Sequence, residues 1–353
     1  MAVGYQAVLW NPFKKKYDLA LAAGVILYIG AFMGVSVLTT PPGQEISPPI
    51  LIIRALGTCA FLMLTIVLSI GPLARLHPFF LPLLYNRRHF GVTTFFIALA
   101  HAFIATGWYH GFGSVNPIVS LFTSSADYST VATVPFEVFG VAAFLILFVL
   151  AATSHDFWLA NLSPPVWKAL HMMVYGAFGA LGLHIALGIL QDETSPLYAW
   201  ILGTGVAWVG GLHLTAGLRQ WMRDSAVILP GNEWQAVGAP SDIADNRARI
   251  LQIEGGDSIA VFRYGDRISA VSNLCAHQNG PLGEGKIIDG CITCPWHGYQ
   301  YKPDSGQSPP PFQEKIATYR VRIDQGTVYV HPAPLPPGTP TPPAVIPSAL
   351  MPA

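Results

Sequence analysis

Four residues near the C-terminal end of the chain supply two kinds of metal-binding side chain, thiolate and imidazole. They form the short motifs C-x-H and C-x2-H, separated by sixteen residues: Cys275, His277, Cys294 and His297. Two chemistries use such a set. A zinc ion accepts two cysteines and two histidines in a closed tetrahedral site. A [2Fe–2S] cluster can hold one iron with two thiolates and the other with two neutral imidazoles, which raises its reduction potential.

The residues around the two motifs favour the cluster over zinc. A glycine-rich loop follows each motif, Tyr299 and Tyr301 follow the second motif, and prolines 309–311 come shortly afterwards. With these neighbours, the pattern C-x-H…C-x2-H resembles the Rieske family. The resemblance covers about residues 234–330 and implies a [2Fe–2S] cluster with the proline-rich loop packed over it. The glycines are Gly280, Gly283 and Gly298.

The same stretch of sequence has the pattern of short β-strands. Runs such as SIAVFRY, GDRISAVSN, ATYRVRID and GTVYVH are rich in β-branched and aromatic residues and are bounded by turn residues. Long helical periods are lacking. We therefore expect a small all-β domain, either a sandwich or a barrel, as the Rieske resemblance implies.

One departure from the family pattern bears on the redox potential. Rieske proteins of quinol-oxidising cytochrome complexes carry two further cysteines, which form a disulfide beside the cluster. Gly280 and Trp296 stand in those positions here, so the domain looks like the ferredoxin type found with aromatic-ring dioxygenases. Because fewer hydrogen bonds to the sulfurs lower the potential, we expect a midpoint toward the bottom of the roughly −150 to +300 mV Rieske range.

Of the two remaining cysteines, Cys291 is expected to be a free thiol or a small core residue, and Cys59 is expected to be buried in the membrane. Cys59 lies in an apolar run, and Cys291 precedes the second motif. Since no pair is left over, a disulfide framework is not indicated, which suits a reducing compartment.

The first two thirds of the chain have the composition of a membrane protein. Hydrophobic residues make up 52% of the sequence, charged residues only 11%, and the formal net charge is zero. Because about 20 apolar residues cross a bilayer as a helix, we expect an all-α membrane bundle of six helices before the all-β domain. The predicted helices cover about 18–38, 50–71, 90–109, 136–153, 166–190 and 197–217.

The basic residues give this bundle an orientation. Lysine and arginine occur before the first helix, in the second and fourth loops and after the sixth helix, whereas the other three loops contain none. Because such residues stay on the cytoplasmic side, both termini and the Rieske domain are predicted to be cytoplasmic, with the bundle in the inner membrane. The residues are Lys14, Lys15, Lys16, Arg75, Arg87, Arg88, Lys168, Arg219 and Arg223.

Histidines inside the predicted helices are further candidate ligands, because ionisable residues at bilayer depth are costly and usually functional. His101 follows an RR-x2-G motif in the third helix, and His171 and His184 lie in the pattern W-x2-LH…Y…H of the fifth. These segments resemble the ferric reductase-like transmembrane family. The resemblance covers about residues 15–220 and implies b-type haem held by histidines of the third and fifth helices.

The rise of an α-helix places these histidines at two depths. At 1.5 Å per residue, His101 and His184 lie about 20 Å and 24 Å beyond the basic residues that precede them, so they can face one haem. His171 lies near the cytoplasmic surface, level with His89. A second haem between those two would lie roughly 18–20 Å from the first.

A second haem would require the fifth helix to bend between its two histidines. Its two histidines are 13 residues apart and point about 140° away from each other in a straight helix, so the helix must bend. Gly176, Gly179 and Gly182 could permit a bend, close helix packing or room for a porphyrin. His213 in the sixth helix is an alternative ligand, although a hydrogen bond between helices explains it as well. We expect three histidines to be solvated in loops: His77, His110 and His155.

The chain is expected to have four parts, none of which binds nucleotides or nucleic acid. The sequence contains no glycine-rich βαβ fingerprint and no Walker motif. The parts are a transmembrane domain at 1–221, a linker at 222–233, a Rieske domain at 234–332 and a proline-rich tail at 333–353, which we expect to be disordered.

Together these features predict transmembrane electron transfer. A cytoplasmic ferredoxin or flavoprotein reductase would reduce the cluster, electrons would pass to haem b, and an outer-face acceptor would receive them. A periplasmic oxidoreductase, ferric iron or quinone could be that acceptor, and membrane lipid surrounds the helices. Two alternatives stay open: direct reduction of ferric chelates or oxygen at the outer haem, and reverse flow from quinol.

Overall fold

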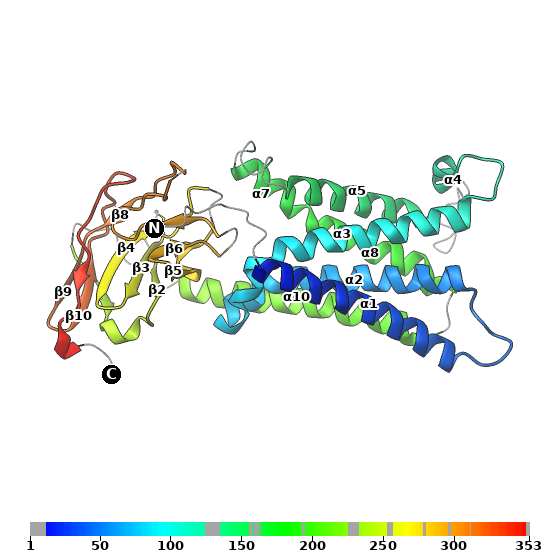
Figure 1. Ribbon diagram of the computed structural model, residues 1–353, viewed down its shortest axis with the longest axis horizontal. Coiled ribbons are helices and arrows are strands. Elements are labelled where there is room, and N and C mark those ends of the chain that lie inside the picture. Colours follow the sequence, from blue (N-terminus) through cyan, green and yellow to red (C-terminus); the bar gives the residue numbers. More distant parts are fainter. Residues whose placement is uncertain are drawn as a thin grey trace. The chain divides into compact units, whose positions relative to one another are not determined.

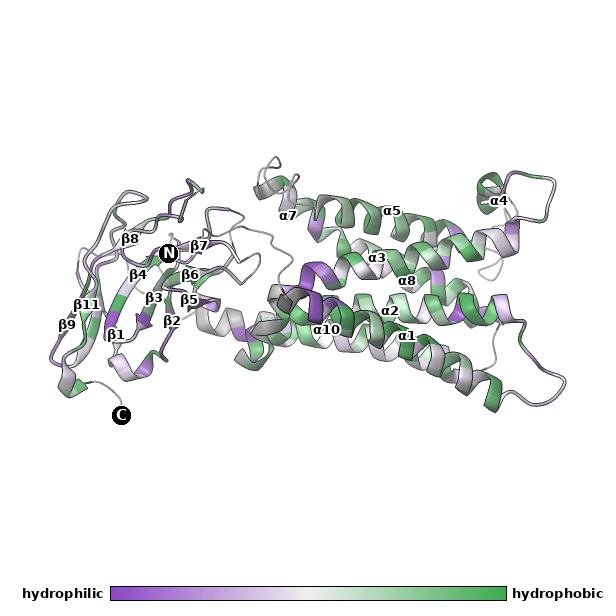
Figure 2. Cartoon of the chain, viewed as in Figure 1, coloured by the Kyte–Doolittle hydropathy of each residue, from purple (hydrophilic) through white to green (hydrophobic). Residues whose placement is uncertain are grey.

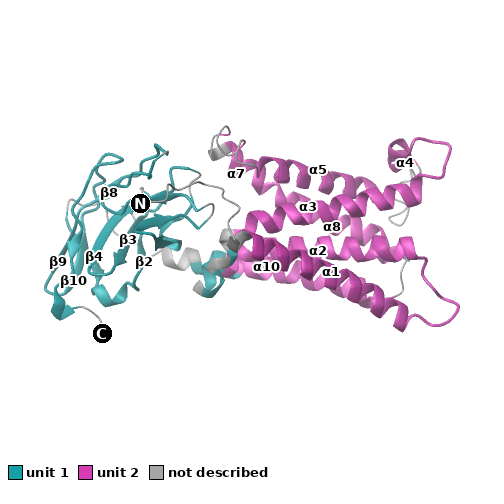
Figure 3. Ribbon diagram, viewed as in Figure 1, with its two compact units in different colours: residues 1–9, 74–85, 215–353 teal, residues 10–73, 86–214 magenta. Residues whose placement is uncertain are grey.

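The chain divides into a helical unit and a β-rich unit, which Figure 3 shows in separate colours. The helical unit contains residues 10–73 and 86–214, and the β-rich unit contains residues 74–85 and 215–353. The computed structural model describes residues 12–123, 135–154, 158, 162, 164–192, 195–224, 233–252, 257–277, 280–295, 298–310 and 312–350.

Helices occur in all six segments predicted to cross the membrane (Figure 1). The chain also forms the short helix α4 and a 3-10 turn at Pro78–Phe80, which were not predicted. The described helices are α1 Pro12–Thr39, α2 Pro48–Leu76, α3 Leu81–His110, α4 Pro117–Thr123, α5 Glu137–Thr153, α7 Pro164–Met172, α8 Val174–Leu187, α9 Ile189–Asp192 and α10 Pro196–Asp224.

Within the described residues, five helical stretches are long and apolar enough to cross a membrane. Figure 2 colours most residues of these helices as hydrophobic. Side chains such as Leu38 and Phe103 are 86% and 78% exposed, as lipid-facing residues are. The sixth predicted segment, α5, is apolar but has only 17 residues. The five stretches are Lys15–Thr39, Pro48–Leu76, Asn86–His110, Ala169–Gln191 and Pro196–Arg219.

The fifth predicted helix is interrupted between its two histidines. α7 ends at Met172 and α8 begins at Val174, and the Met173 amide donates to the carbonyl of Leu170 rather than one residue further back. Such a bond tightens the helix to a 3-10 turn and changes the direction in which later side chains point. The interruption therefore lies at Met173, about one turn before the three glycines that could permit a bend.

α2 is the most buried of the candidate spans. Leu64 and Leu68 of this helix pack in one apolar cluster with Phe95 of α3, Leu147 of α5 and Ala177 of α8. The helices that carry the candidate haem ligands are therefore held around a common core.

The β-rich unit consists of three antiparallel sheets, which confirms the expected class of a helical membrane part followed by a small β domain. Their strand orders are β1-β10-β9, β11-β4-β3-β2 with β8 also on β4, and β5-β6-β7. The strands are β1 Gln235–Gly238, β2 Arg247–Leu251, β3 Ile259–Tyr264, β4 Arg267–Ser272, β5 Lys286–Ile288, β6 Cys291–Thr293, β7 Gln300–Tyr301, β8 Thr318–Tyr319, β9 Val321–Asp324, β10 Thr327–Val330 and β11 Ala344–Val345.

The expectation of a disordered tail after residue 332 was wrong for residues 333–350. The Leu335 and Thr341 amides donate to carbonyl oxygens of Thr318 and Asp304, and β11 adds an antiparallel strand to β4. Ile346 is only 3% exposed and joins the core of the β-rich unit. Prolines keep this segment extended, while the residues between them supply the hydrogen bonds and apolar contacts that anchor it.

Candidate metal centres

Each cysteine of the two motifs begins a loop that is closed by its own backbone. An isolated β-bridge joins Leu274 to Pro281, and the Cys275 amide donates to the carbonyl of Gly280 at 2.9 Å. In the second loop, the Cys294 amide donates to the carbonyl of Tyr299 at 2.7 Å. Each loop is therefore short and closed by backbone hydrogen bonds, with a candidate ligand at its first position.

The β5–β6 hairpin positions the second loop. Asp289 and Gly290 connect the strands with φ values of +51° and +75°, the signature of a type I′ turn. β6 pairs with β5 on one side and with β7 on the other. Cys294 directly follows β6 and Tyr299 directly precedes β7, so the sheet fixes both ends of the loop.

The two cysteine side chains lie in the same apolar core. Cys275 and Cys294 are each 1% exposed and share a cluster with Tyr299 and Tyr301. The ring of His277 stacks on that of Tyr299, with centroids 4.7 Å apart and planes within 9°. Two buried sulfurs beside aromatic rings and a half-buried imidazole suit a cluster whose thiolates are sheltered and whose histidines reach the surface.

His297, the fourth predicted ligand, lies outside the described residues, as does Trp296. Among the His, Cys, Asp and Glu side chains that the structure describes, no three converge closely enough to hold a metal ion. The assignment of Cys275, His277, Cys294 and His297 to a [2Fe–2S] cluster thus stays a prediction. Cys59 is buried within α2, and Cys291 is partly buried on β6.

Two tyrosines that follow the second motif, Tyr299 and Tyr301, have side chains close to the candidate ligands. The hydroxyl of Tyr301 lies 3.3 Å from the sulfur of Cys275. Burial raises the pKa of Tyr301, and the neighbouring Cys275 raises it further, so the phenol stays protonated and can donate to the sulfur. The hydroxyl of Tyr299 instead donates to the carboxylate of Glu314, and burial together with Glu314 raises the pKa of Tyr299 as well.

We expect Tyr301→Phe to lower the midpoint potential of the cluster without removing it. Hydrogen bonds to cluster sulfurs stabilise the more negative, reduced state, and the substitution deletes the donor beside Cys275. A redox titration followed by EPR measures the shift. Tyr299→Phe is the matched control, with a smaller effect expected. An unchanged potential in Tyr301→Phe would contradict the proposed hydrogen bond.

In the helical unit, His101 of α3 and His184 of α8 face each other. Their ring centroids are 6.4 Å apart and their planes are nearly perpendicular, at 84°. His101 Nδ1 lies 2.9 Å from the carbonyl oxygen of Ile53, and His184 Nδ1 lies 3.1 Å from that of Phe136. Because a carbonyl only accepts, both Nδ1 atoms carry the proton, which leaves each Nε2 with a lone pair for a metal.

The spacing of the two rings fits a single metal ion between them. An imidazole nitrogen coordinates a first-row metal at about 2.0–2.1 Å, so two rings on opposite sides of one ion have centroids roughly 6 Å apart. Backbone carbonyls that bind the opposite ring nitrogen are the usual outer partners of such ligands. The spacing of His101 and His184 would therefore suit two imidazole ligands of one metal ion, such as a haem iron.

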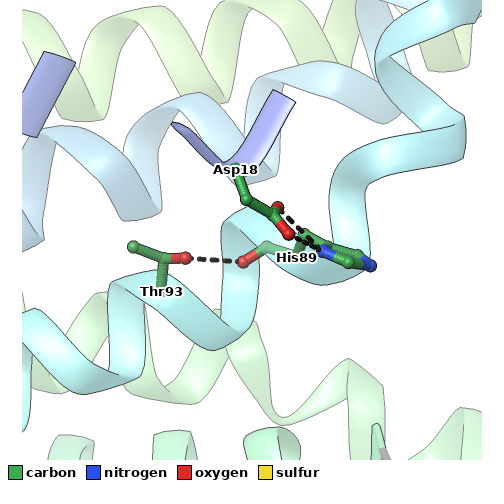
Figure 4. A network of polar contacts seen from close by, with 3 residues as sticks. All are labelled: Asp18, His89 and Thr93. Carbon is green, nitrogen blue, oxygen red and sulfur yellow. Dashed lines mark hydrogen bonds and ion pairs between the residues drawn. The ribbon is translucent and has the colours of Figure 1, made fainter. Parts of the chain in front are cut away.

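The second predicted pair, His171 and His89, has a different environment. His171 stacks on Trp167 with centroids 3.7 Å apart, Nδ1 lies 3.0 Å from the Trp167 carbonyl oxygen, and Nε2 is buried without a hydrogen-bond partner in the described structure. His89 Nδ1 lies 2.8 Å from the carboxylate of Asp18 in α1, while Thr93 donates to the His89 carbonyl (Figure 4). A carboxylate bound to Nδ1 is compatible with a metal at Nε2.

The remaining histidines are accounted for by other contacts. Both ring nitrogens of His213 are engaged, Nδ1 with the Val209 carbonyl and Nε2 with the Tyr175 hydroxyl at 2.8 Å, which supports a bond between helices over a ligand. His110 is not solvated as expected. It is 9% exposed at the end of α3 and bonds Ser120. His77 is exposed, as predicted, and His155 lies outside the described residues.

Comparison with known proteins matches both parts of the chain. The family model of the Rieske [2Fe-2S] domain matches residues 233–320, and that of the ferric reductase like transmembrane component matches residues 55–182. The anthranilate 1,2-dioxygenase ferredoxin subunit of Burkholderia cepacia is 35% identical over 28% of this chain and 92% of its own length. Ferredoxin CarAc of Metapseudomonas resinovorans is 31% identical, again over 28% of this chain and 92% of its own.

Two further similarities are more limited. Magnetosome protein MamZ of Magnetospirillum gryphiswaldense is 30% identical over 40% of this chain, which spans only 20% of MamZ. In a solved complex of the oxygenase and ferredoxin of carbazole 1,9a-dioxygenase, one chain is 28% identical, with a TM-score of 0.29 over 30% of this chain and 99% of that chain. The sequence matches to ferredoxins therefore carry the assignment.

Proposed function

This chain belongs to the Rieske [2Fe–2S] family over residues 233–320 and carries a ferric reductase-like transmembrane component over residues 55–182. We propose that it transfers electrons across a membrane. A cytoplasmic ferredoxin or flavoprotein reductase reduces a Rieske cluster, and the electrons pass to haem b in the helical unit. They leave at the outer face to a periplasmic oxidoreductase, ferric iron or quinone.

The proposed ligands divide between the two units. Cys275 and Cys294 hold one iron of the cluster, and His277 and His297 hold the other. His101 and His184 hold haem b, and a second haem would use His171 with His89. When bound, the cluster and the haem each take up and release single electrons. The protein supplies the ligands, the burial of the sulfurs and the protonation state of each imidazole.

The observation that carries the proposal is the pair His101 and His184. Two imidazoles face each other with ring centroids 6.4 Å apart inside an apolar helical unit. His101 Nδ1 donates to the Ile53 carbonyl of α2, and His184 Nδ1 donates to the carbonyl of Phe136, the residue just before α5. Matched restraint is what a metal ligand requires, because the orientation of the ring fixes the direction of its lone pair.

The proposed direction of electron flow and the cytoplasmic location of the Rieske domain rest on the distribution of lysine and arginine. Lysine and arginine cluster at one side of the predicted bundle, and the positive-inside rule places that side and the Rieske domain in the cytoplasm. The ferredoxin names of the curated relatives support a donor or acceptor that is itself an electron-transfer protein.

Cofactor analysis of the protein purified in mild detergent tests this function. Iron, acid-labile sulfide and haem are quantified, and the dithionite-reduced sample is examined by EPR at low temperature. A Rieske-type signal with haem b in the same chain is expected, and a haem-to-cluster ratio of two would support the site at His171 and His89. A Rieske signal without haem would contradict electron transfer across the membrane through this chain.

A further inference from the structure

The helical unit contains an internal repeat. The sequence GTCAFLML at residues 57–64 of α2 and GVAAFLIL at residues 140–147 of α5 share five identical residues in register. The residue numbers of the two segments differ by 83, and the same difference relates His101 to His184. The α2–α3 pair of helices therefore corresponds to the α5–α8 pair.

The contacts of the two histidines follow the same correspondence. His101 bonds the carbonyl of Ile53, and His184 bonds that of Phe136; these carbonyl residues also differ by 83. His101 thus reaches a carbonyl within α2, and His184 reaches the corresponding carbonyl at the N-terminal end of α5.

Two aromatic contacts connect the α2–α3 pair of helices to the α5–α8 pair, and they are equivalent when the two pairs are exchanged. Phe61 of α2 stacks on Phe178 of α8 with centroids 5.6 Å apart, and Phe144 of α5 stacks on Phe95 of α3 at 5.6 Å. Adding 83 to residue 61 gives 144 and adding 83 to residue 95 gives 178, so one contact becomes the other when the helix pairs are exchanged. This is the behaviour of a pseudo-twofold relation, with His101 and His184 meeting across it.

A glycine lies under each imidazole, one helical turn after the carbonyl that binds it. A Cβ atom at Gly57 would lie 2.9 Å from Cε1 of His101, and one at Gly140 would lie 2.8 Å from Nδ1 of His184. Residues four apart in a helix share a face, so carbonyl and glycine form one seat: the carbonyl binds the ring, and the absent side chain lets the ring approach the backbone.

We propose that Gly57 and Gly140 are positioning residues for the two axial haem ligands, one from each copy of the repeat. The inference rests on the proposed function, since it assumes that His101 and His184 hold haem. The two seats fix the rings at the nearly perpendicular orientation of 84°. Axial imidazole planes in that arrangement give ferric low-spin haem a strongly anisotropic EPR signal.

Gly57→Ala and Gly140→Ala test the proposal in the full-length protein. In each variant the added methyl displaces the imidazole from the carbonyl that orients it. Because disturbing an outer partner of a metal ligand typically costs about 10-fold to 100-fold in affinity, haem retention is expected to weaken by about that factor, and the EPR signal of the haem that remains is expected to shift. The pseudo-symmetry predicts changes of the same kind in both variants. Gly30→Ala in α1 and Gly203→Ala in α10 are matched controls, because a Cβ at either position meets nothing within 4 Å.

A second measurement separates ligand positioning from general damage to the fold. If the imidazole is the only group that the new methyl disturbs, Gly57→Ala lowers thermal stability in the wild-type background but not in a His101→Ala background. Gly57→Ala proteins that keep wild-type haem content, EPR signal and potential would overturn the inference while the proposed function stands. Wild-type protein that binds no haem would overturn both.

Discussion

Cys275→Ser is expected to remove the Rieske cluster while leaving haem in the helical unit. The Cys275 sulfur is buried in the core of the β-rich unit, where no water can replace it as a ligand, and a serine hydroxyl stays protonated at neutral pH and binds iron poorly. Loss of the Rieske EPR signal and of acid-labile sulfide measures the effect, and reduction of haem by a cytoplasmic electron donor should fall with it.

Cys291→Ser is the control for this substitution. Cys291 lies on β6, three residues before Cys294 and outside the C-x2-H motif, and burial raises the pKa of its thiol. The control should keep the cluster and the electron transfer to haem. A Cys275→Ser protein that retained the Rieske signal would contradict the ligand assignment.

His184→Ala is expected to abolish haem binding at the pair formed with His101. The substitution removes one axial ligand and leaves His101 alone, which lowers affinity by at least about 100-fold when losing even an outer partner costs 10-fold to 100-fold. The loss appears in the haem absorption spectrum of the purified protein, and the EPR signal of the Rieske cluster should be unchanged.

His213→Ala provides the comparison for the membrane histidines. Both nitrogens of His213 are engaged, with Val209 and Tyr175, so its removal should cost helix packing but no haem. If His213→Ala lost haem and His184→Ala kept it, the assignment of axial ligands would be wrong.

Much of this arrangement could be predicted from the sequence because it depends on local spacing. The C-x-H and C-x2-H motifs mark loops that the β5–β6–β7 sheet closes, and the rise of a helix was enough to bring His101 level with His184. Both inferences use distances along one element, which are fixed by backbone geometry.

Features that depend on packing between elements were missed. The 3-10 turn at Met173 could not be predicted, because neither Met173 nor its immediate neighbours are proline or glycine. His110 is buried beside α4, where it bonds Ser120, and the hydropathy pattern did not predict that helix. The proline-rich tail was taken as disordered from its composition, although Ile346 had a place in the core. The composition of a segment shows how much apolar surface it could bury. It does not show whether the rest of the protein has a groove or core into which that surface can pack.

The seats of the two histidines did leave a signal in the sequence. Comparison of the chain with itself shows Gly57 and Gly140 at corresponding positions of the repeat, 44 residues before His101 and His184 respectively. From the sequence alone, the glycines expected to give a porphyrin room were Gly176, Gly179 and Gly182, because they lie in the same helical segment as His184. In the structure, the glycines that contact the imidazoles belong to the neighbouring helices.

Rapid-mixing spectroscopy with a reduced ferredoxin tests whether electrons pass from the Rieske cluster to the haem. The purified, oxidised protein is mixed with the donor, and the cluster and haem absorption bands are followed in the wild type and in Cys275→Ser. We predict that the cluster is reduced before the haem in the wild type and that haem reduction is lost in Cys275→Ser. Haem reduction at the same rate in both proteins would contradict transfer from the Rieske domain to the membrane.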